Sequence, residues 1–362
     1  MGNAEEFIGP MEDAQGADGA NGEEIMIDGD DLEEETQPTK IAPSPQLPSA
    51  EEVEEHRISH LPFRNWCREC VEGKALGEHR GARPGGESLV PVVGVDYFYL
   101  TLNGMFHRSE LADFPQTEEG ETALKEARVQ ATVVCCILMR CSRTKNIFAH
   151  VLPHKGVDEN GYIVKLLVKD LRWLGHTRLI VKADNEPALQ KLVKLALREL
   201  NVTAADDGLE QAGQEQSPPY DSQANGLTEV GIRMLRAQFR TVKACLQRRL
   251  GKRIPEAHPI AAWLLEHCCM LMKALQRGSD GMTPWLRARG RPFGKRLVGF
   301  GETVLYKLPT KGPAYDARGN SAARWSQGIF LGYSHENNSY MIGNGRNVET
   351  SRALMRRPFE NR

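Results

Sequence analysis

The stretch from Ser217 to Leu250 reads SPPYDSQANGLTEVGIRMLRAQFRTVKACLQRRL, and its pattern decides how the rest of the chain is interpreted. Turn-forming residues at 217–221 lead into a helical pattern, and Asn225-Gly226 lies where that helix begins. Apolar residues then recur at spacings of three and four: Leu235, Phe239, Val242, Leu246 and Leu250. This spacing predicts a long helix with one face in the core.

One carboxylate heads a row of cations on another face of the same helix. With about 100° of rotation per residue, five charged side chains fall within one narrow arc: Glu229, Arg233, Arg236, Arg240 and Lys243. One interpretation is a solvated face supported by pairs spaced i,i+4. The other is a metal-binding Glu229 beside a stripe that contacts phosphates. The second interpretation requires partner carboxylates elsewhere in the chain.

Two aspartates meet that requirement. Asp96 interrupts the otherwise apolar run LVPVVGVDYFYL, which is typical of a strand buried on both faces. A carboxylate inside such a strand is costly unless it is paired or binds a metal. Asp184 follows the predicted strand of HTRLIVKADNEP, at the strand end where ligands bind in α/β sheets. An N-cap of the next helix is the alternative role for Asp184.

The segment HRISHLPFRNWCREC holds a candidate zinc set. His56 and His60 share one helix face, because residues i and i+4 are neighbours there, and Cys67-x-x-Cys70 presents two thiolates together. Six residues separate the two pairs, whereas zinc fingers use about a dozen. Two solvated histidines and two incidental cysteines are therefore the alternative interpretation.

The composition describes an acidic beginning and a basic body. Residues 1–55 hold 17 Asp and Glu against one Lys, whereas the remaining 307 residues hold 45 Lys and Arg against 31 Asp and Glu. An acidic segment with few aromatic residues and many Gly and Pro predicts a disordered tail. A basic body favours a polyanionic partner.

Other classes are excluded by what the sequence lacks. It has no run of about 18 apolar residues that would span a membrane, and no secretory signal is visible at its N-terminus. The eight cysteines include two adjacent pairs inside apolar segments, which is typical of free thiols in a reducing compartment. We therefore expect an intracellular protein with no membrane association.

From residue 89 onward the pattern alternates strands and helices, and the chain ends in short strands. The predicted strands cover 89–100, 127–142, 146–153, 176–183 and 202–205, and the predicted helices cover 158–175, 187–200, 226–250 and 259–275. Residues 103–127 and 206–222 are predicted as polar excursions. The segments FGETVLYKL, RWSQGIFLGY, SYMIG and NVETSRAL predict a small β-barrel or sheet.

The order Asp96, Asp184, Glu229, on a strand, a strand end and a helix, resembles the Asp-Asp-Glu core of retroviral and retrotransposon integrases. The segment SPPYDSQANGLTE is the most specific part, since this family places its third acid three residues after a Gly preceded by Asn or Gln. The His₂Cys₂ element, the linker GKALGEHRG and the C-terminal strands resemble the flanking parts of copia-type members. Over residues 56–358 the chain thus resembles a copia-type retrotransposon integrase.

The resemblance implies an α/β fold and a division into five parts. The core would be RNase H-like, with a mixed five-stranded sheet and flanking helices. The implied parts are a disordered acidic tail (1–55), a His₂Cys₂ element and linker (56–88), the catalytic core (89–255), a helical connector (256–292) and a small β-barrel of the Src-homology-3 type that binds nucleic acid (293–362). The 44 residues between Asp184 and Glu229 exceed the family spacing, which implies an insertion at 206–216.

The implied activity is metal-dependent DNA integration, through 3′-end processing and strand transfer. Asp96 would bridge two Mg²⁺ (or Mn²⁺) ions, and Asp184 and Glu229 would each complete one side. The cations of the long helix would follow the DNA backbone, and Asn225 would position a strand end. The implied partners are DNA and further copies of the chain on that DNA, and the implied location is the nucleus.

Two alternatives stay open at this point. The chain could be a catalytically inactive or domesticated nucleic-acid-binding protein that keeps the acids, with the acidic tail competing with DNA for the basic body. It could also be an RNase H-type nuclease, which would need a fourth acid that the sequence does not identify.

Overall fold

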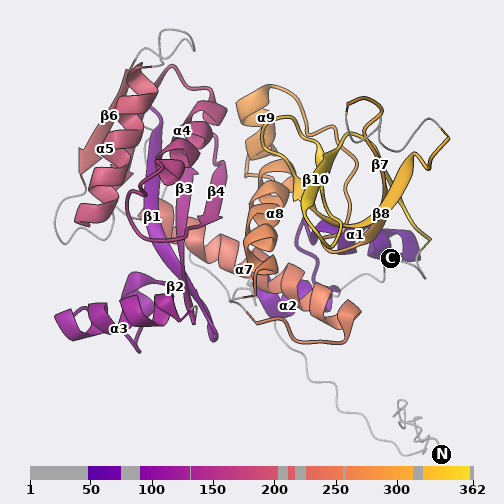
Figure 1. Ribbon diagram of the computed structural model, residues 1–362, viewed down its shortest axis with the longest axis horizontal. Coiled ribbons are helices and arrows are strands. Elements are labelled where there is room, and N and C mark those ends of the chain that lie inside the picture. The colour runs from indigo at the N-terminus through magenta and orange to yellow at the C-terminus, as the bar shows by residue number, and fades with distance from the viewer. Residues whose placement is uncertain are drawn as a thin grey trace, which may run out of the picture. The chain divides into compact units, whose positions relative to one another are not determined.

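The computed structural model describes residues 48–74, 90–130, 132–202, 211–216, 226–255, 258–312 and 321–358 (Figure 1). These residues belong to one compact unit, residues 45–362. The first described helices are α1 (Ala50–Ser59) and α2 (Arg68–Lys74). A capping box of Ser49 and Glu52 begins α1, so the helix takes in residues 50–55 that the sequence had assigned to the acidic tail.

The larger sheet is mixed. Its strands are β1 (Val92–Thr101), β2 (Gly104–His107), β3 (Val133–Cys141), β4 (Ile147–Val151), β5 (Arg178–Ala183) and β6 (Gln211–Gln216). The order is β4-β3-β1-β5-β6, and β2 pairs with β1 outside this path. β1 runs antiparallel to β3 and β2 but parallel to β5, which in turn runs parallel to β6. The prediction of an α/β fold with a mixed sheet is therefore confirmed, but the sheet has six strands, of which β2 and β6 were not predicted.

Helices cover both faces of this sheet. On one face, α4 (Tyr162–Leu174) and α5 (Pro187–Val202) enclose a core with the odd-numbered residues of β1, such as Val95 and Tyr97. On the other face, α7 (Gly226–Leu250) and α8 (Ile260–Leu275) pack on even-numbered residues such as Phe98 and Leu100. Alternation along β1 thus sends successive side chains into two separate cores.

Several local sequence signals set the element ends. Gly175 adopts a left-handed conformation (φ 70°) and ends α4, and Pro187 begins α5, as predicted. In α7 the apolar stripe is buried from Leu235 to Leu246, but Leu250 is exposed. Leu250, the last residue of α7, therefore does not belong to the core face.

Three elements lie where the sequence predicted otherwise. The excursion at 103–127 contains β2, a short 3₁₀ turn η1 (Arg108–Glu110) and helix α3 (Glu118–Val129), so the second long strand starts at Val133 rather than at residue 127. β6 lies in the segment predicted as a polar loop and insertion, because β5 offers it a parallel edge. Of the predicted strand at 202–205, Val202 is the last residue of α5 and 203–205 lie outside the described residues.

The C-terminal part forms a second, antiparallel sheet. Its strands are β7 (Thr303–Lys307), β8 (Trp325–Tyr333), β9 (Tyr340–Gly343), β10 (Val348–Ser351) and β11 (Leu354–Arg356), in the order β10-β9-β8-β7-β11. The short helix α9 (Pro284–Arg289) packs Trp285 against this sheet, and α8 supplies Met270 to the same core. No helix in the described ranges is both long and apolar enough to cross a membrane.

Candidate functional site

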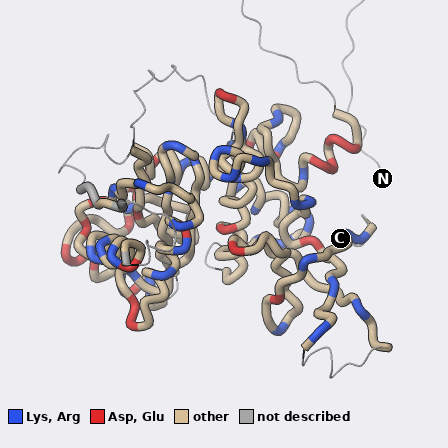
Figure 2. Tube along the Cα trace, turned by 90° about the horizontal axis from the view of Figure 1, so that it is seen from above, with Lys and Arg blue, Asp and Glu red and all other residues tan. Residues whose placement is uncertain are grey.

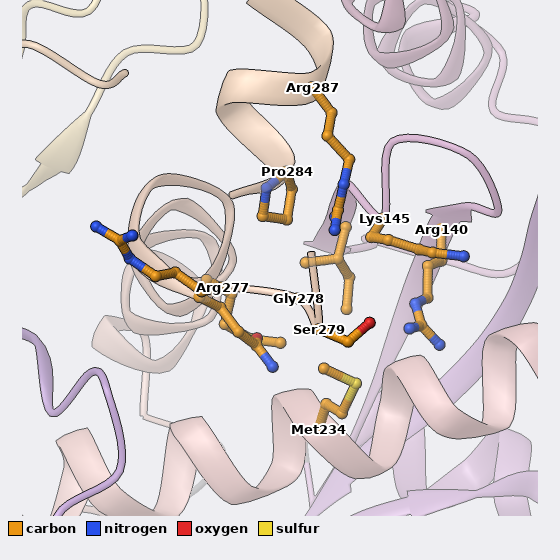
Figure 3. A pocket seen from close by; sticks show the side chains of 11 residues that line it. Arg140, Lys145, Met234, Arg277, Gly278, Ser279, Pro284 and Arg287 are labelled. Carbon is orange, nitrogen blue, oxygen red and sulfur yellow. The ribbon is translucent and has the colours of Figure 1, made fainter. Parts of the chain in front are cut away.

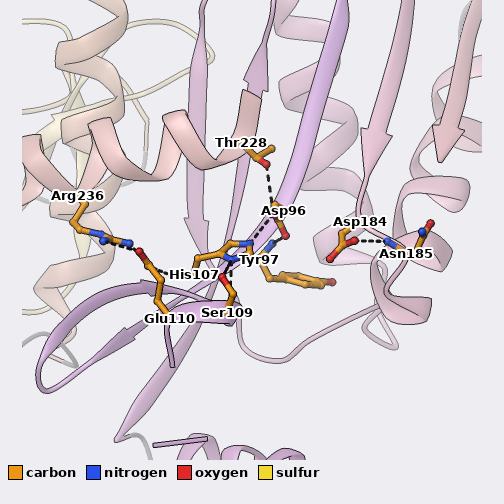
Figure 4. A network of polar contacts seen from close by, with 9 residues as sticks. All are labelled: Asp96, Tyr97, His107, Ser109, Glu110, Asp184, Asn185, Thr228 and Arg236. Carbon is orange, nitrogen blue, oxygen red and sulfur yellow. Dashed lines mark hydrogen bonds and ion pairs between the residues drawn. The ribbon is translucent and has the colours of Figure 1, made fainter. Parts of the chain in front are cut away.

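Asp96 and Asp184 lie beside each other on two parallel strands. Val95 of β1 is paired with Ala183, the last residue of β5. Asp96 follows Val95 on β1, and Asp184 is the first residue after β5. Val95 and Ala183 both face the core under α4 and α5, so the aspartates face the opposite side, which α7 covers. Figure 4 shows the two carboxylates side by side at this end of the sheet.

The Asp96 carboxylate is buried and has three hydrogen-bond partners. Its Oδ1 accepts the backbone N–H of Tyr97 (2.8 Å), and its Oδ2 lies 3.0 Å from His107 Nε2 and accepts the Thr228 hydroxyl at 3.4 Å. The hydrogen bond to Asp96 raises the pKa of His107. The sequence analysis found neither partner. His107 lies in no motif, and in SPPYDSQANGLTE only Asn225 and Glu229, not Thr228, were assigned a role.

Glu229 lies on the first turn of α7, directly after Thr228, and is exposed. The contact with Asp96 is the main cause of the raised pKa of His107, and burial opposes it. The charge of Glu229 makes a smaller contribution that also raises this pKa. Helix α7 therefore brings Glu229 toward the face of the sheet that carries the two aspartates. The carboxylates of Asp96, Asp184 and Glu229 are not gathered tightly around one point.

A further acid lies close to this group. Glu186, two residues after Asp184, forms an ion pair with Lys155 (2.8 Å). Burial raises the pKa of Glu186, and the charge of Asp96 raises it further. The contact with Lys155 lowers the same pKa and so opposes both effects. Glu186 is thus a carboxylate with its own cation partner close to the strand ends.

The cation row of α7 is not a free stripe. Arg236 forms a two-point ion pair with Glu110 of η1, Arg240 donates to the backbone oxygen of Gly73 (3.0 Å), and Lys243 is buried. Only Arg233 of the four is exposed with no ion pair or hydrogen bond among the described residues. Arg236 and Arg240 therefore contact neighbouring elements, and the role of the four cations along a DNA backbone stays a prediction. Asn225 lies outside the described residues.

The four residues of the predicted zinc set come together. The ligand atoms of His56, His60, Cys67 and Cys70 all lie within 4.8 Å of one another, and all four side chains are buried. Cys70 Sγ lies 3.2 Å from His56 Nε2, and Cys67 Sγ lies 3.4 Å from His60 Nδ1. Within the described part of the chain, no other set of three or more His, Cys, Asp and Glu side chains is arranged to hold an ion.

The chemistry of this His₂Cys₂ group fits zinc. Two imidazoles and two thiols form a common closed zinc set. The Cys67 contact lowers the pKa of Cys70 to about 7, whereas the pKa of Cys67 is raised by the same contact and by burial. Nε2 of His60 is buried without a hydrogen-bond partner within the described ranges, so the group is not satisfied by protein alone. His56, His60, Cys67 and Cys70 are the residues that would hold the ion.

The His₂Cys₂ element is fixed to the second half of α7. Arg248 of α7 pairs with Glu69 and, at 2.6 Å, with Glu72 of α2, and Gln238 donates to the backbone oxygen of Ser59 (2.8 Å). Gly73 packs so closely that a Cβ there would lie 2.2 Å from the Thr241 hydroxyl. One helix therefore carries Glu229 at its start and contacts the His₂Cys₂ element with its second half.

The basic surplus is spread over the described body. Figure 2 shows Lys and Arg positions interspersed with Asp and Glu positions along the whole trace, with no half of one sign. Local groups of cations, rather than one continuous face, are therefore the places to look for anion contacts.

No family model matches the chain, and no curated protein matches it. Among solved structures, the chain is similar to a simian T-cell lymphotropic virus intasome in complex with PP2A regulatory subunit B56 gamma. The identity is 12%, the TM-score is 0.31, and the match covers 75% of this chain and 84% of that chain.

Proposed function

We propose that the chain is an integrase-like polynucleotidyl transferase of the copia retrotransposon type, which binds DNA and joins DNA ends with Mg²⁺ or Mn²⁺. One observation carries this proposal. Asp96 and Asp184 lie beside each other on parallel strands, and α7 brings Glu229 toward the same face. The sequence resemblance around SPPYDSQANGLTE adds to it.

The proposed roles follow from the chemistry of phosphoryl transfer. Two divalent ions supply charge neutralisation at the scissile phosphate and activate the attacking oxygen. Carboxylate oxygens are the ligands that Mg²⁺ prefers. In the proposal Asp96, the most buried of the three acids, is the shared ligand, and Asp184 and Glu229 are the outer ligands.

The proposal extends to the other parts of the chain. The mixed sheet with antiparallel β4, β3 and β1 and parallel β5 and β6 is the strand arrangement expected of an RNase H-like core. We assign residues 89–255 to this core, 56–88 to a zinc element with its linker, 256–292 to the connector and 293–362 to a small β-barrel. Action on DNA as a homo-oligomer, in the nucleus, belongs to the same proposal.

The test is strand transfer by the purified full chain on a labelled duplex with Mg²⁺. The Asp184→Asn variant removes one metal ligand, and Glu159→Gln is the matched control, since Glu159 is an exposed carboxylate before α4. We expect joining by the wild type and by Glu159→Gln, and none by Asp184→Asn. Degradation of an RNA–DNA hybrid without joining would instead assign the chain to the RNase H-type nucleases.

A second candidate function rests on how Asp96 is engaged. Its carboxylate already has three hydrogen-bond partners, and the cations of α7 mostly hold other parts of the chain. These contacts favour a DNA-binding protein that keeps the fold without catalysis. DNA binding with no joining by the wild type, under both Mg²⁺ and Mn²⁺, would establish this second function.

A further inference from the structure

A cation-lined cavity lies apart from the acids and is not used by the proposed chemistry. It has a volume of about 250 Å³ and lies between the β3–β4 turn, α7, the end of α8 and the start of α9. None of the described residues that line it is acidic, whereas Arg140, Lys145, Arg277 and Arg287 are cations. Figure 3 shows Arg140 and Arg287 pointing toward Ser279, with Lys145 beside Arg140, whereas Arg277 extends to the other side.

The positive charge at this cavity is only partly neutralised. Arg287 is paired with Asp280, from Nε to Oδ2 at 3.2 Å and from Nη2 to Oδ1 at 2.6 Å. The pKa of Arg140 is lowered, first by burial and then by the neighbouring charge of Arg233. The exposed ammonium of Lys145 has no ion pair or hydrogen bond within the described part of the chain. Arg140, Lys145 and Arg233 therefore form a group of cations without a local anion.

The walls of the cavity are held in a defined geometry. Asn146 is fully buried in the β3–β4 turn, and its Nδ2 donates to the backbone oxygen of Pro284 at 2.9 Å, which ties the turn to α9. Gly278 lies against Arg287, and a Cβ at this position would lie 2.3 Å from Nη2 of the guanidinium. The loop between α8 and α9 thus fits closely around the Arg287–Asp280 pair. Packed elements therefore hold the walls of the cavity, and Lys145 lies at its exposed side.

The cavity shares a sheet face and a helix turn with the acids. Arg140 of β3 is paired with Gly94 of β1, and Asp96 follows Gly94 by two residues. The side chains of Arg140 and Asp96 therefore lie on the same face of the sheet, which α7 covers. Arg140 Nη1 donates to the backbone oxygen of Leu227 (3.1 Å), and the next residue, Thr228, donates to Asp96. The first turn of α7 therefore contacts the acid site on one side and the cation group on the other.

We infer that this cavity binds a phosphate group of the nucleic-acid strand whose reacting phosphodiester lies at the acids, an inference that rests on the proposed function. Unpaired cations give affinity for phosphate without sequence choice. The Ser279 hydroxyl adds a neutral donor to the same phosphate. The cavity would anchor the strand on the far side of the first turn of α7, which fixes how the strand crosses the acid site.

The experiment measures binding of a labelled duplex by fluorescence anisotropy, with the full chain, over a series of salt concentrations. No Mg²⁺, Mn²⁺ or chelator is added, so neither joining nor loss of the ion from the His₂Cys₂ group affects the result. Lys145→Glu reverses the exposed charge at the cavity, and Lys145→Gln removes it. The matched control is Lys194→Glu, an exposed lysine on α5, which covers the other face of the sheet.

We expect Lys145→Glu to weaken binding about ten-fold and Lys145→Gln to weaken it less, with the slope of log affinity against log salt reduced by about one. Lys194→Glu should change the affinity less than about two-fold. Equal affinities of the wild type and Lys145→Glu would overturn the inference. So would binding of inorganic phosphate or pyrophosphate that depends on Lys145 but does not compete with DNA, since the ligand would then be a free phosphate.

The result is separate from the test of the enzyme. If Lys145→Glu weakens DNA binding and the wild type joins no DNA, the phosphate contact stands and the catalytic proposal fails. If the wild type joins DNA and Lys145→Glu binds as well as the wild type, the catalytic proposal stands and the phosphate contact fails.

Discussion

Asp96 and Asp184 occupy equivalent positions in the parallel pairing of β1 and β5, one residue beyond the paired Val95 and Ala183. Their carboxylates therefore leave the sheet on the same face, although 87 residues separate them in the sequence. Two neighbouring carboxylates repel each other when both are ionised, and a divalent cation between them removes this repulsion. This pair is the structural basis of the first prediction.

Mg²⁺ or Mn²⁺ should stabilise the wild type against thermal unfolding. At ten times the dissociation constant, linkage predicts a gain of about 1.4 kcal/mol. Asp96→Asn and Asp184→Asn should lose most of this gain, because each removes one charge from the site. Differential scanning calorimetry with and without the ion measures it, and Glu159→Gln is the control. An equal gain in all four proteins would show that the ion binds elsewhere.

The His₂Cys₂ group should hold one zinc ion per chain. Cys67→Ser and Cys70→Ser each remove one ligand, so zinc measured by atomic emission should fall from about one equivalent to well below one. Cys245→Ser is the control, since Cys245 lies on α7 outside the group. Full zinc content in both ligand variants would contradict the assignment. Loss of zinc from Cys245→Ser as well would mean that the ion depends on the packing of α7 and not on these ligands.

Parts of this arrangement were predictable from short-range signals. Gly175 and Pro187 mark the ends of helices through their own backbone preferences, and the Cys-x-x-Cys spacing places two thiols together in any context. β6 was not predictable, because its sequence QAGQEQ has no strand pattern and the strand depends on pairing with β5. Periodicity also found the charged face of α7, but it could not show that Arg236 and Arg240 meet other parts of the chain.

Gly73→Ala should loosen the attachment of the His₂Cys₂ element to α7. The added Cβ would lie 2.2 Å from the Thr241 hydroxyl and 3.2 Å from the Thr241 Cα, so the helices must separate. We expect a loss of about 1–3 kcal/mol in urea unfolding. Thr241→Ala in the same chain should recover part of this loss, because the hydroxyl is removed. Gly294→Ala is the control, since no atom lies within 4 Å of its added Cβ.

Removal of residues 1–47 should raise the affinity for DNA. This segment carries most of the acidic residues of the 1–55 tail, so its charge competes with a polyanion for the basic body. We expect a several-fold increase at low salt that shrinks as salt rises, because screening weakens the competition. Anisotropy with the two chains measures it. An unchanged affinity at low salt would show that the tail does not compete with DNA.

His150 should make stability depend on pH in the alkaline range. Its Nε2 lies 2.7 Å from Asp170 Oδ2 and its Nδ1 lies 3.0 Å from Glu266 Oε1. Burial alone would lower the pKa of His150, but the charge and hydrogen bond of Asp170, followed by those of Glu266, raise it to about 10. A pKa above the unfolded value of about 6.5 means that the folded state holds the proton more tightly. This contribution to stability is complete below pH 6.5 and is lost as the pH rises toward 10.

Lys273, in the same buried region, has the opposite effect over part of this range. Burial lowers its pKa to about 8, so its charge destabilises the folded state below that pH. The difference between the wild type and His150→Gln isolates the histidine, because Lys273 is present in both. We expect the free energy of unfolding of the wild type to fall with pH more steeply than that of His150→Gln, by up to about 1.4 kcal/mol per pH unit. Urea titrations at several pH values measure this difference, and His154→Gln is the control. Parallel curves of the free energy of unfolding against pH for the wild type and His150→Gln would show that His150 carries no proton in the folded protein.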